Sequence, residues 1–256
     1  MKNILDICFA GIIPARYASS RFPGKPLALI GDKPMIQRVY EQASKVLNKV
    51  YVATDDERIF NCVVGFGGKA IMTSSNHLSG TDRCSEAVAK IENETGEKID
   101  VVINIQGDEP FIKPEQIEAL IKLFANEKVE IATLIRKTDA DENLFNPNQP
   151  KVIINSMGEA IYFSRSVIPF IRDFEMSEWS KKHTFFKHIG LYAYKTQTLH
   201  EITKLSRSPL EIAESLEQNR WIENGYRIMT AITDWESIGI DAPEDLEKAK
   251  ILLKNR

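Results

Sequence analysis

The sequence is short of cysteine, carries no large excess of charge of either sign and contains no long apolar run. Its three cysteines, Cys8, Cys62 and Cys84, are odd in number and form no CxxC pair, so they support neither a disulfide framework nor a zinc site. The 33 lysines and arginines are nearly balanced by 36 aspartates and glutamates, which gives a formal net charge of -3. This balance argues against a protein that mainly coats nucleic acid, although a local basic cluster could still bind a small anion.

No apolar run approaches the ~20 residues that a helix needs to cross a membrane. Near the N-terminus, Asp6 interrupts the apolar run, the segment 14–16 ends it, and no convincing cleavage site follows. We therefore expect a cytoplasmic protein with reduced thiols and no membrane segment. Its 256 residues, 43% of them hydrophobic, are enough to bury a large core without disulfides.

The first half of the chain alternates short apolar runs with amphipathic stretches. We expect strands at 8–14, 50–53, 69–72, 101–105 and 131–135, and helices at 35–47, 57–66, from Thr81 or Asp82 to 91, and from Pro114 onward. A β-α-β-α order predicts a parallel sheet with right-handed crossovers. Because such sheets bind ligands at the carboxyl ends of their strands, the loops after Pro14, Met72 and Ile105 are the candidate sites.

The second half is richer in strands. We expect a hairpin of 152–155 and 160–163, strands at 190–194, 227–232 and 238–240, and helices at 210–224 and 243–253. No repeat or linker divides the chain. The pattern predicts one α/β domain over residues 1–256, with a β-rich insertion at about 150–200.

A basic loop follows the first expected strand. Its sequence, PARYASSRFPGKP, holds Arg16, Arg21 and Lys25 together with serines and a glycine, a composition that can bind a polyphosphate. Pro26 after Gly24-Lys25 excludes a Walker A loop, which requires Ser or Thr there. The alternative is a solvated basic loop, and the position directly after a strand favours the functional interpretation.

Two carboxylates also follow expected strands. Asp108 lies in QGDEP after 101–105, and Asp241 lies in GIDAPED near the end of the chain. Carboxylates at strand ends can hold Mg²⁺ against phosphates, but Asp108 could equally be a turn former and Asp241 a helix N-cap. From the residues alone these alternatives stay open.

Several segments in order resemble the 3-deoxy-manno-octulosonate (Kdo) cytidylyltransferase family. They are IIPARYASSRFPGKPL, VATDD, HLSGTDRCSEA, NIQGDEPFI, YFSRSVIPF, KHIGLYAY, SPLEIAESLEQNRW and IGIDAPEDL, and they span about residues 11–246. The resemblance implies a Rossmann-like nucleotide-diphospho-sugar transferase fold, with a mixed, mostly parallel sheet and a small β-rich dimerisation region. It also implies CTP and Kdo as substrates, CMP-Kdo and pyrophosphate as products, Mg²⁺ as cofactor, and a homodimer.

The resemblance further implies roles for individual residues. Those expected on the nucleotide are Ala15, Arg16, Arg21, Lys25, Gly80, Thr81, Arg83 and Asp108, and those expected on the sugar are Gln106, Arg165, His188, Tyr192, Glu211 and Gln218. Asp108 and Asp241 are expected on the metal, and Arg16, Lys25, Asp108 and Asp241 to serve catalysis.

Two of these residues have plain structural alternatives. Arg165 is the natural partner of the Kdo carboxylate, because its planar guanidinium matches two oxygens, but it could be a structural ion pair. His188 could be a buried histidine of the core. The rival functions are activation of another acidic sugar, such as 8-amino-Kdo or a sialic acid, and nucleotide-sugar binding without catalysis.

Overall fold

The computed structural model describes residues 4–18, 22–139, 142–236, 239–240 and 242–254. The strands are β1 (Phe9–Ala15), β2 (Leu29–Ile30), β3 (Lys33–Pro34), β4 (Val50–Thr54), β5 (Ala70–Met72), β6 (Val101–Asn104), β7 (Ile131–Lys137), β8 (Lys151–Ile154), β9 (Ala160–Ser164), β10 (Phe186–Lys195) and β11 (Ile228–Ile232). The α-helices are α1 (Met35–Ala43), α2 (Glu57–Gly65), α3 (Gly80–Thr95), α4 (Pro114–Leu123), α5 (Trp179–Lys182), α6 (Thr196–Ile202), α7 (Pro209–Glu214), α8 (Glu217–Glu223) and α9 (Pro243–Lys254).

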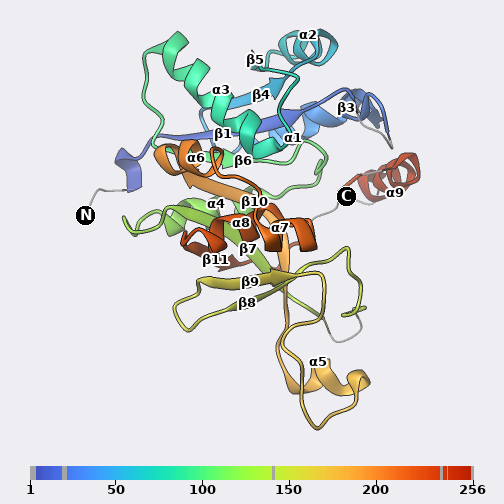
Figure 1. Ribbon diagram of the computed structural model, residues 1–256. Helices are drawn as coiled ribbons and strands as arrows, with labels where there is room; N and C mark the ends of the chain where they lie inside the picture. The colour runs from blue at the N-terminus through green and yellow to red at the C-terminus, as the bar shows by residue number, and fades with distance from the viewer. Residues whose placement is uncertain (1–3, 19–21, 140–141, 237–238, 241, 255–256) are drawn as a thin grey trace.

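A mixed sheet forms the centre of the molecule, with the strand order β11-β7-β10-β6-β1-β4-β5 (Figure 1). Strands β6, β1, β4 and β5 are parallel, as expected, and β11 is parallel to β7. Strand β10 runs antiparallel to both of its neighbours, β6 and β7, and also pairs with β8 of the hairpin β8–β9. The carboxyl ends of β1, β4 and β6 therefore share one edge of the sheet.

Apolar side chains fill two layers, one on each face of the sheet. Helices α3, α6 and α8 cover one face, where Trp221 and Phe163 are among the largest buried side chains. Helices α1, α2 and α4 cover the other face, around Val39 and Leu120. Strands such as β4 are buried along their whole length, which explains why they appear in the sequence as continuous apolar runs.

Helix ends follow local signals in the sequence, although α1 ends at Ala43 and α3 at Thr95, where we expected 47 and 91. Pro114 opens α4 as expected. Helix α3 begins slightly earlier than predicted, because Ser79, and neither Thr81 nor Asp82, is its N-cap. The side chains of Ser79 and Asp82 bond each other's backbone N–H groups in a capping box, and Gly96 ends the helix in the left-handed conformation.

The second half departs further from the prediction, which contained neither α5 nor α6. The expected helix at 210–224 is two helices, α7 and α8, because Ser215 adopts φ 49° and ψ 47°, a left-handed conformation that no helix continues through. Of the strand expected at 238–240, residue 238 lies outside the described residues, and 239–240 form no strand. The hairpin is confirmed as β8–β9, and the strand at 190–194 is the longer β10.

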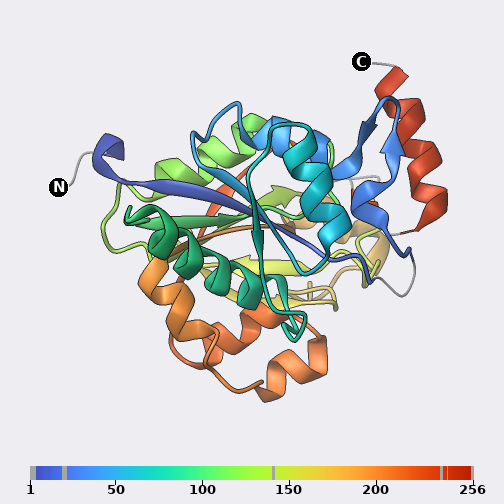
Figure 2. The same ribbon diagram turned by 90° about the horizontal axis from the view of Figure 1, so that it is seen from above.

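The C-terminal helix α9 returns to the N-terminal half of the chain. Both views place it beside the β2–β3 segment (Figures 1 and 2). A small apolar cluster that contains Ile30, Met35, Phe111, Ile240 and Ala249 joins them. Among the described residues, the structure contains no helix with the length and apolarity needed to cross a membrane.

Candidate active site

The basic loop and the QGDEP segment meet at the carboxyl edge of the sheet. Ala15 ends β1 and is buried, and Arg16 follows it with an exposed side chain. Lys25 Nζ lies 2.7 Å from Asp108 Oδ2, which joins the two motifs by an ion pair. Arg21 lies outside the described residues. The edge therefore presents cations and a carboxylate side by side, as a site for phosphates and a metal requires.

Two backbone contacts fix Asp108 in this position. A Cβ atom at Gly107 would lie 2.8 Å from the Pro14 carbonyl oxygen, so only glycine lets the QGDEP turn pass this close to β1. The Ile240 N–H donates to the Asp108 carbonyl at 2.9 Å. This bond brings the GIDAPED motif next to QGDEP, although Asp241 itself lies outside the described residues.

The donor set suits a hard cation only in part. Among the described residues, no three His, Cys, Asp or Glu side chains gather closely enough to hold a metal ion. Asp108 supplies carboxylate oxygens, which Mg²⁺ prefers, and phosphate oxygens and water usually complete such a site. The residues present therefore fit a magnesium ion on condition that phosphate oxygens and water supply most of its ligands.

A cavity of about 560 Å³ opens at the same edge. Six predicted residues line it, from five separate motifs: Gly80, Thr81, Gln106, Arg165, Tyr192 and Gln218. The remaining lining residues are Asn104, Gly190, Tyr194, Glu217 and Trp221. The structure thus brings two of the residues expected on the base and four of those expected on the sugar into one cavity.

A β-bulge shapes the wall that β10 contributes to this cavity. The register of β10 against β7 shifts between Ile189 and Tyr192. The Thr133 hydroxyl lies 2.9 Å from the Leu191 carbonyl oxygen and 3.2 Å from that of Ile189, so it bridges two residues of the bulge. Bulges redirect side chains next to binding sites, and this one places Gly190 and Tyr192 at the cavity.

Four polar groups in the cavity wall are buried without a hydrogen-bond partner of ordinary geometry among the described residues. They are Tyr192 Oη, Tyr194 Oη, Gln218 Nε2 and Trp221 Nε1. The Trp221 ring packs edge-on against both tyrosines, at centroid distances of 5.2 and 5.5 Å. Burial raises the pKa of both tyrosines well above the ordinary value, although weaker contacts of Tyr192 with Thr133 and of Tyr194 with Thr81 act to lower it, so their hydroxyls stay protonated. A buried polar group without a partner costs about 1–3 kcal/mol, so such a cluster indicates a site for a polar ligand.

Glu217 is the clearest residue of the cavity that the sequence did not reveal. Its carboxylate accepts a hydrogen bond from Thr81 Oγ1 at 2.8 Å and another from Arg220 Nη2 at 2.7 Å. Burial raises the pKa of this carboxyl. The spacing of Glu217, Gln218 and Trp221 could have indicated that they share one helix facing the cavity. That signal can be used only when it is known that the helix ends at Ser215 and a new one, α8, begins.

Arg165 lines the cavity and also holds its wall together. Its Nε donates to the Glu214 carbonyl at 2.6 Å, Nη1 to the Pro147 carbonyl at 3.0 Å and Nη2 to the Ser215 carbonyl at 3.3 Å. The Glu214 carboxylate accepts from the Arg165 backbone N–H at 2.9 Å. Of the five N–H groups of a guanidinium, two are not engaged in these bonds. The structural alternative for Arg165 thus takes the form of a clamp on backbone carbonyls, and the expected contact with the sugar carboxylate stays a prediction.

Two residues expected on the sugar lie behind the cavity wall. Glu211 instead closes a capping box with Ser208 at the start of α7. His188 packs between the rings of Phe163 and Tyr192, and burial lowers its pKa to about 3. These two side chains therefore support the wall, because neither lines the cavity.

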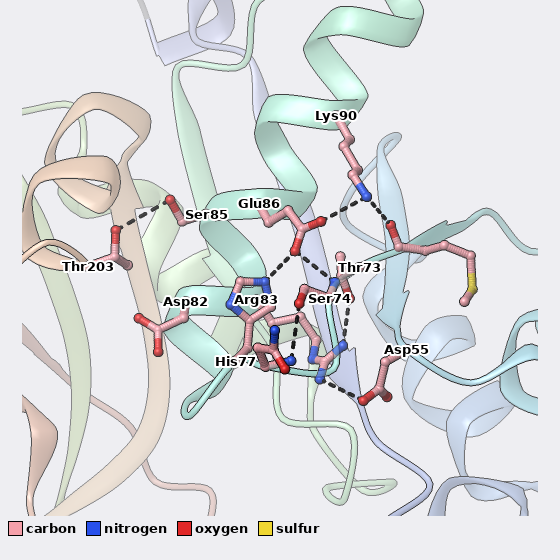
Figure 3. Close-up of polar contacts among 12 residues, drawn as sticks. Asp55, Thr73, Ser74, His77, Asp82, Arg83, Ser85, Glu86, Lys90 and Thr203 are labelled. Carbon is pink, nitrogen blue, oxygen red and sulfur yellow. Dashed lines mark hydrogen bonds and ion pairs between the residues drawn. The ribbon is translucent and has the colours of Figure 1, made fainter.

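Arg83, expected beside the base or ribose, is only 1% exposed. Its Nη1 donates to Thr73 Oγ1 at 2.6 Å, and its Nη2 lies 3.4 Å from Asp55 Oδ2 (Figure 3). Arg83 thus ties helix α3 to the ends of β4 and β5. In this structure it positions the segment around Gly80 and does not face the cavity.

The comparisons with known proteins identify the class. The family model described as cytidylyltransferase matches residues 10–230 of the chain. A solved structure of CMP:2-keto-3-deoxy-manno-octonic acid synthetase complexed with CTP is 41% identical, with a TM-score of 0.87 over 97% of this chain and 99% of that one. A cytidylyltransferase from Leptospira borgpetersenii, 18% identical with a TM-score of 0.62, shares the fold over 98% of this chain and 88% of its own. The fold is that of a Rossmann-like nucleotidyltransferase.

Relatives of higher identity narrow the class to one family. The 3-deoxy-manno-octulosonate cytidylyltransferase of Parabacteroides distasonis is 60% identical over 97% of this chain and 99% of its own length. That of Bacteroides thetaiotaomicron is 58% identical over 97% of this chain and 99% of its own length. The chain belongs to the 3-deoxy-manno-octulosonate cytidylyltransferase family, as the sequence motifs predicted.

Proposed function

We propose that this protein transfers CMP from CTP to the anomeric 2-hydroxyl of Kdo and releases pyrophosphate. One observation carries the proposal: a cavity opens near the Lys25–Asp108 pair, at one edge of the sheet, and its wall holds four buried polar groups without a hydrogen-bond partner of ordinary geometry in the described part of the chain. The cavity offers partners for a sugar rich in hydroxyls, and the ion pair offers charges for a triphosphate and its metal. The relatives from Parabacteroides distasonis and Bacteroides thetaiotaomicron are named for this reaction.

The triphosphate lies along the basic loop in this proposal. Lys25 and Arg16, with Arg21 outside the described residues, neutralise the phosphate oxygens, and the base lies toward Gly80 and Thr81. The 41% identical synthetase was solved as a complex with CTP, which supports the same nucleotide here. Attack on the α-phosphorus by the sugar hydroxyl, in line with the leaving pyrophosphate, requires both substrates to be held from opposite sides.

Asp108 and Asp241 would hold Mg²⁺ together with phosphate oxygens. The bond between Ile240 and Asp108 supports this arrangement, because it brings the two motifs together. When bound, the metal stabilises negative charge on the phosphoryl oxygens and on the leaving group. Lys25 keeps the Asp108 carboxylate oriented toward the same space through their 2.7 Å contact.

The sugar lies in the cavity with its carboxylate toward Arg165. Arg165 is the only cation that lines this cavity within the described part of the chain, and two of its N–H groups remain for a carboxylate. The buried hydroxyls of Tyr192 and Tyr194 and the amide of Gln218 then meet the sugar hydroxyls. Gln106 and Asn104 lie between this end and the phosphates.

The same proposal includes a cytoplasmic homodimer that serves lipopolysaccharide synthesis. The arm around α5 and the hairpin β8–β9 projects from one end of the molecule (Figure 1). It exposes large apolar side chains, with exposed fractions of 70% for Phe170, 57% for Met176 and 52% for Ile161. A second copy of the chain that covers these side chains would remove them from water, which favours association.

Release of pyrophosphate tests the activity directly. In control reactions CTP, Kdo and Mg²⁺ are each omitted in turn, and we expect release only when all three are present. The variant Asp108→Asn should lower turnover at least about a hundredfold, because it removes a charged oxygen ligand. Asp173→Asn, at an exposed residue of the arm, is the matched control and should keep normal turnover.

A panel of sugars separates the rival functions. Faster turnover with 8-amino-Kdo or a sialic acid than with Kdo would reassign the substrate. Binding of CTP without pyrophosphate release from any acidic sugar would instead support a protein that binds nucleotide sugars without catalysis. Normal turnover by Asp108→Asn at saturating Mg²⁺ would remove Asp108 from the metal site.

A further inference from the structure

The turn between β5 and α3 leads directly into the cavity. It covers residues 73–79, and the next two residues, Gly80 and Thr81, line the cavity. No side chain from residue 74 to residue 79 is buried, and Leu78 is 86% exposed. The turn therefore has no apolar anchor of its own, and its conformation depends on polar contacts.

Glu86 of α3 supplies the central polar contacts. Its carboxylate accepts a hydrogen bond from the Ser74 N–H at 2.9 Å and contacts His77 Nε2 (Figure 3). Lys90, one helical turn further on, lies 2.8 Å from the same carboxylate. The Lys90 ammonium also donates to the Met72 carbonyl at 2.8 Å. The Glu86 carboxylate thus holds Ser74 and His77 of the turn against α3, and Lys90 links it to the end of β5.

The two ends of the turn are held separately. Arg83 bonds Thr73 at the start, and the Ser79 capping box fixes the end. Between these fixed ends, Glu86 holds the middle of the turn against α3, and within the turn the Asn76 N–H donates to Ser74 Oγ at 3.1 Å. Burial alone would raise the pKa of Glu86, but Lys90, the Ser74 N–H and His77 outweigh it and lower the pKa to about 2. The carboxylate stays charged at any pH at which the protein would work.

We propose that Glu86 is a positioning residue for the nucleotide: it holds turn 73–79 against α3 so that Gly80 and Thr81 present the correct surface to the base. The inference rests on the proposed function, because it assumes that the base lies at Gly80 and Thr81. Glu86 itself does not line the cavity. Its effect should therefore fall on nucleotide affinity and base discrimination, and not on the chemical step or on the sugar.

Steady-state kinetics separates these effects. For Glu86→Ala we expect the KM for CTP to rise about tenfold, a size that fits the loss of one or two hydrogen bonds, with the KM for Kdo and kcat changed less than about twofold. The ratio of kcat/KM for CTP over UTP should fall. Glu86→Gln keeps an oxygen for the Ser74 N–H but loses its charge, so it should be intermediate. Glu94→Ala, at an exposed residue of the same helix, should match the unaltered protein.

Calorimetric titration with CTP alone distinguishes this inference from the proposed activity. If the protein binds CTP but releases no pyrophosphate, weaker binding by Glu86→Ala still upholds the positioning role. Absence of CTP binding by the unaltered protein overturns both proposals. If Glu86→Ala does not fold, His77→Gln probes the same contact from the turn. Unchanged CTP affinity in the folded variant, or an equal loss for CTP and Kdo, would overturn the inference.

Discussion

Replacing Arg165 by Met should lower both the unfolding free energy of the protein and its affinity for the sugar. The guanidinium donates to the carbonyls of Glu214, Pro147 and Ser215, at 2.6, 3.0 and 3.3 Å. These carbonyls belong to the segment that precedes β8 and to the junction between α7 and α8. Because α8 carries Gln218 and other residues of the cavity, release of the clamp should loosen the wall against which the sugar is proposed to bind.

The size of the effect follows from the three bonds. Each is worth about 1 kcal/mol for a partly exposed group, so the variant should lose about 2–4 kcal/mol of unfolding free energy. For a chain of this length that corresponds to a melting temperature lowered by about 5–12 °C. Arg165→Lys can keep one bond and the charge, so it should lose about two thirds as much stability.

Scanning calorimetry and Kdo kinetics together test the two roles of Arg165. If Arg165 also contacts the sugar carboxylate, Arg165→Met should raise the KM for Kdo well beyond Arg165→Lys, while the KM for CTP changes little in both. A melting temperature of Arg165→Met within about 1 °C of the unaltered protein would refute the clamp. An equal KM for Kdo in the two variants would refute the carboxylate contact.

Three further outcomes are expected. The pKa of His188 is about 3 in the folded protein against an ordinary 6.5, so between these pH values the unfolded chain binds more protons. The unfolding free energy should therefore fall as pH drops from 6.5 toward 3, by at most about 1.4 kcal/mol per pH unit. Urea titrations of His188→Gln at several pH values should lack this contribution to the pH dependence. Lys187, 3% exposed, pairs with Glu142 and Glu236, so Lys187→Met should cost about 2–3 kcal/mol in urea unfolding, reduced by the exposure of Glu236; an unchanged midpoint would contradict this. Ser215→Val should cost about 1–2 kcal/mol because of the left-handed backbone, whereas Ser215→Gly should not, and equal melting temperatures for the two variants would contradict the strain.

Local patterns were sufficient for most elements of the first half. Strands such as β4 and β6 are buried on both faces, and their apolar runs are visible without any knowledge of neighbours. Pro114 opens α4 as predicted, because a proline in the first turn acts locally, whereas α3 starts and ends outside its predicted bounds, at Gly80 and Thr95. The strand-end positions of Asp108 and Gln106 followed from the same patterns.

The division at Ser215 could not be predicted in this way. Residues 210–224 have helical spacing throughout, and nothing at Ser215 resembles a usual helix stop. The left-handed backbone there accompanies the Arg165 clamp, whose partner carbonyls at Glu214 and Ser215 lie about 50 residues away in the sequence. Contacts at such separation are settled by tertiary packing, and Glu217 and Trp221 reached the cavity only through that break.

The sequence by itself determined most of the order of strands and helices, the family, and the motifs that supply the candidate site, because these depend on residues adjacent in the chain. The tertiary structure decided which of those residues line the cavity. Arg83, His188 and Glu211 belong to recognisable motifs but do not line it, while Glu217 does. Whether a polar side chain faces a ligand or supports a wall depends on the groups packed around it from distant segments, and the bulge in β10 shows how one shift of register can decide this for Tyr192.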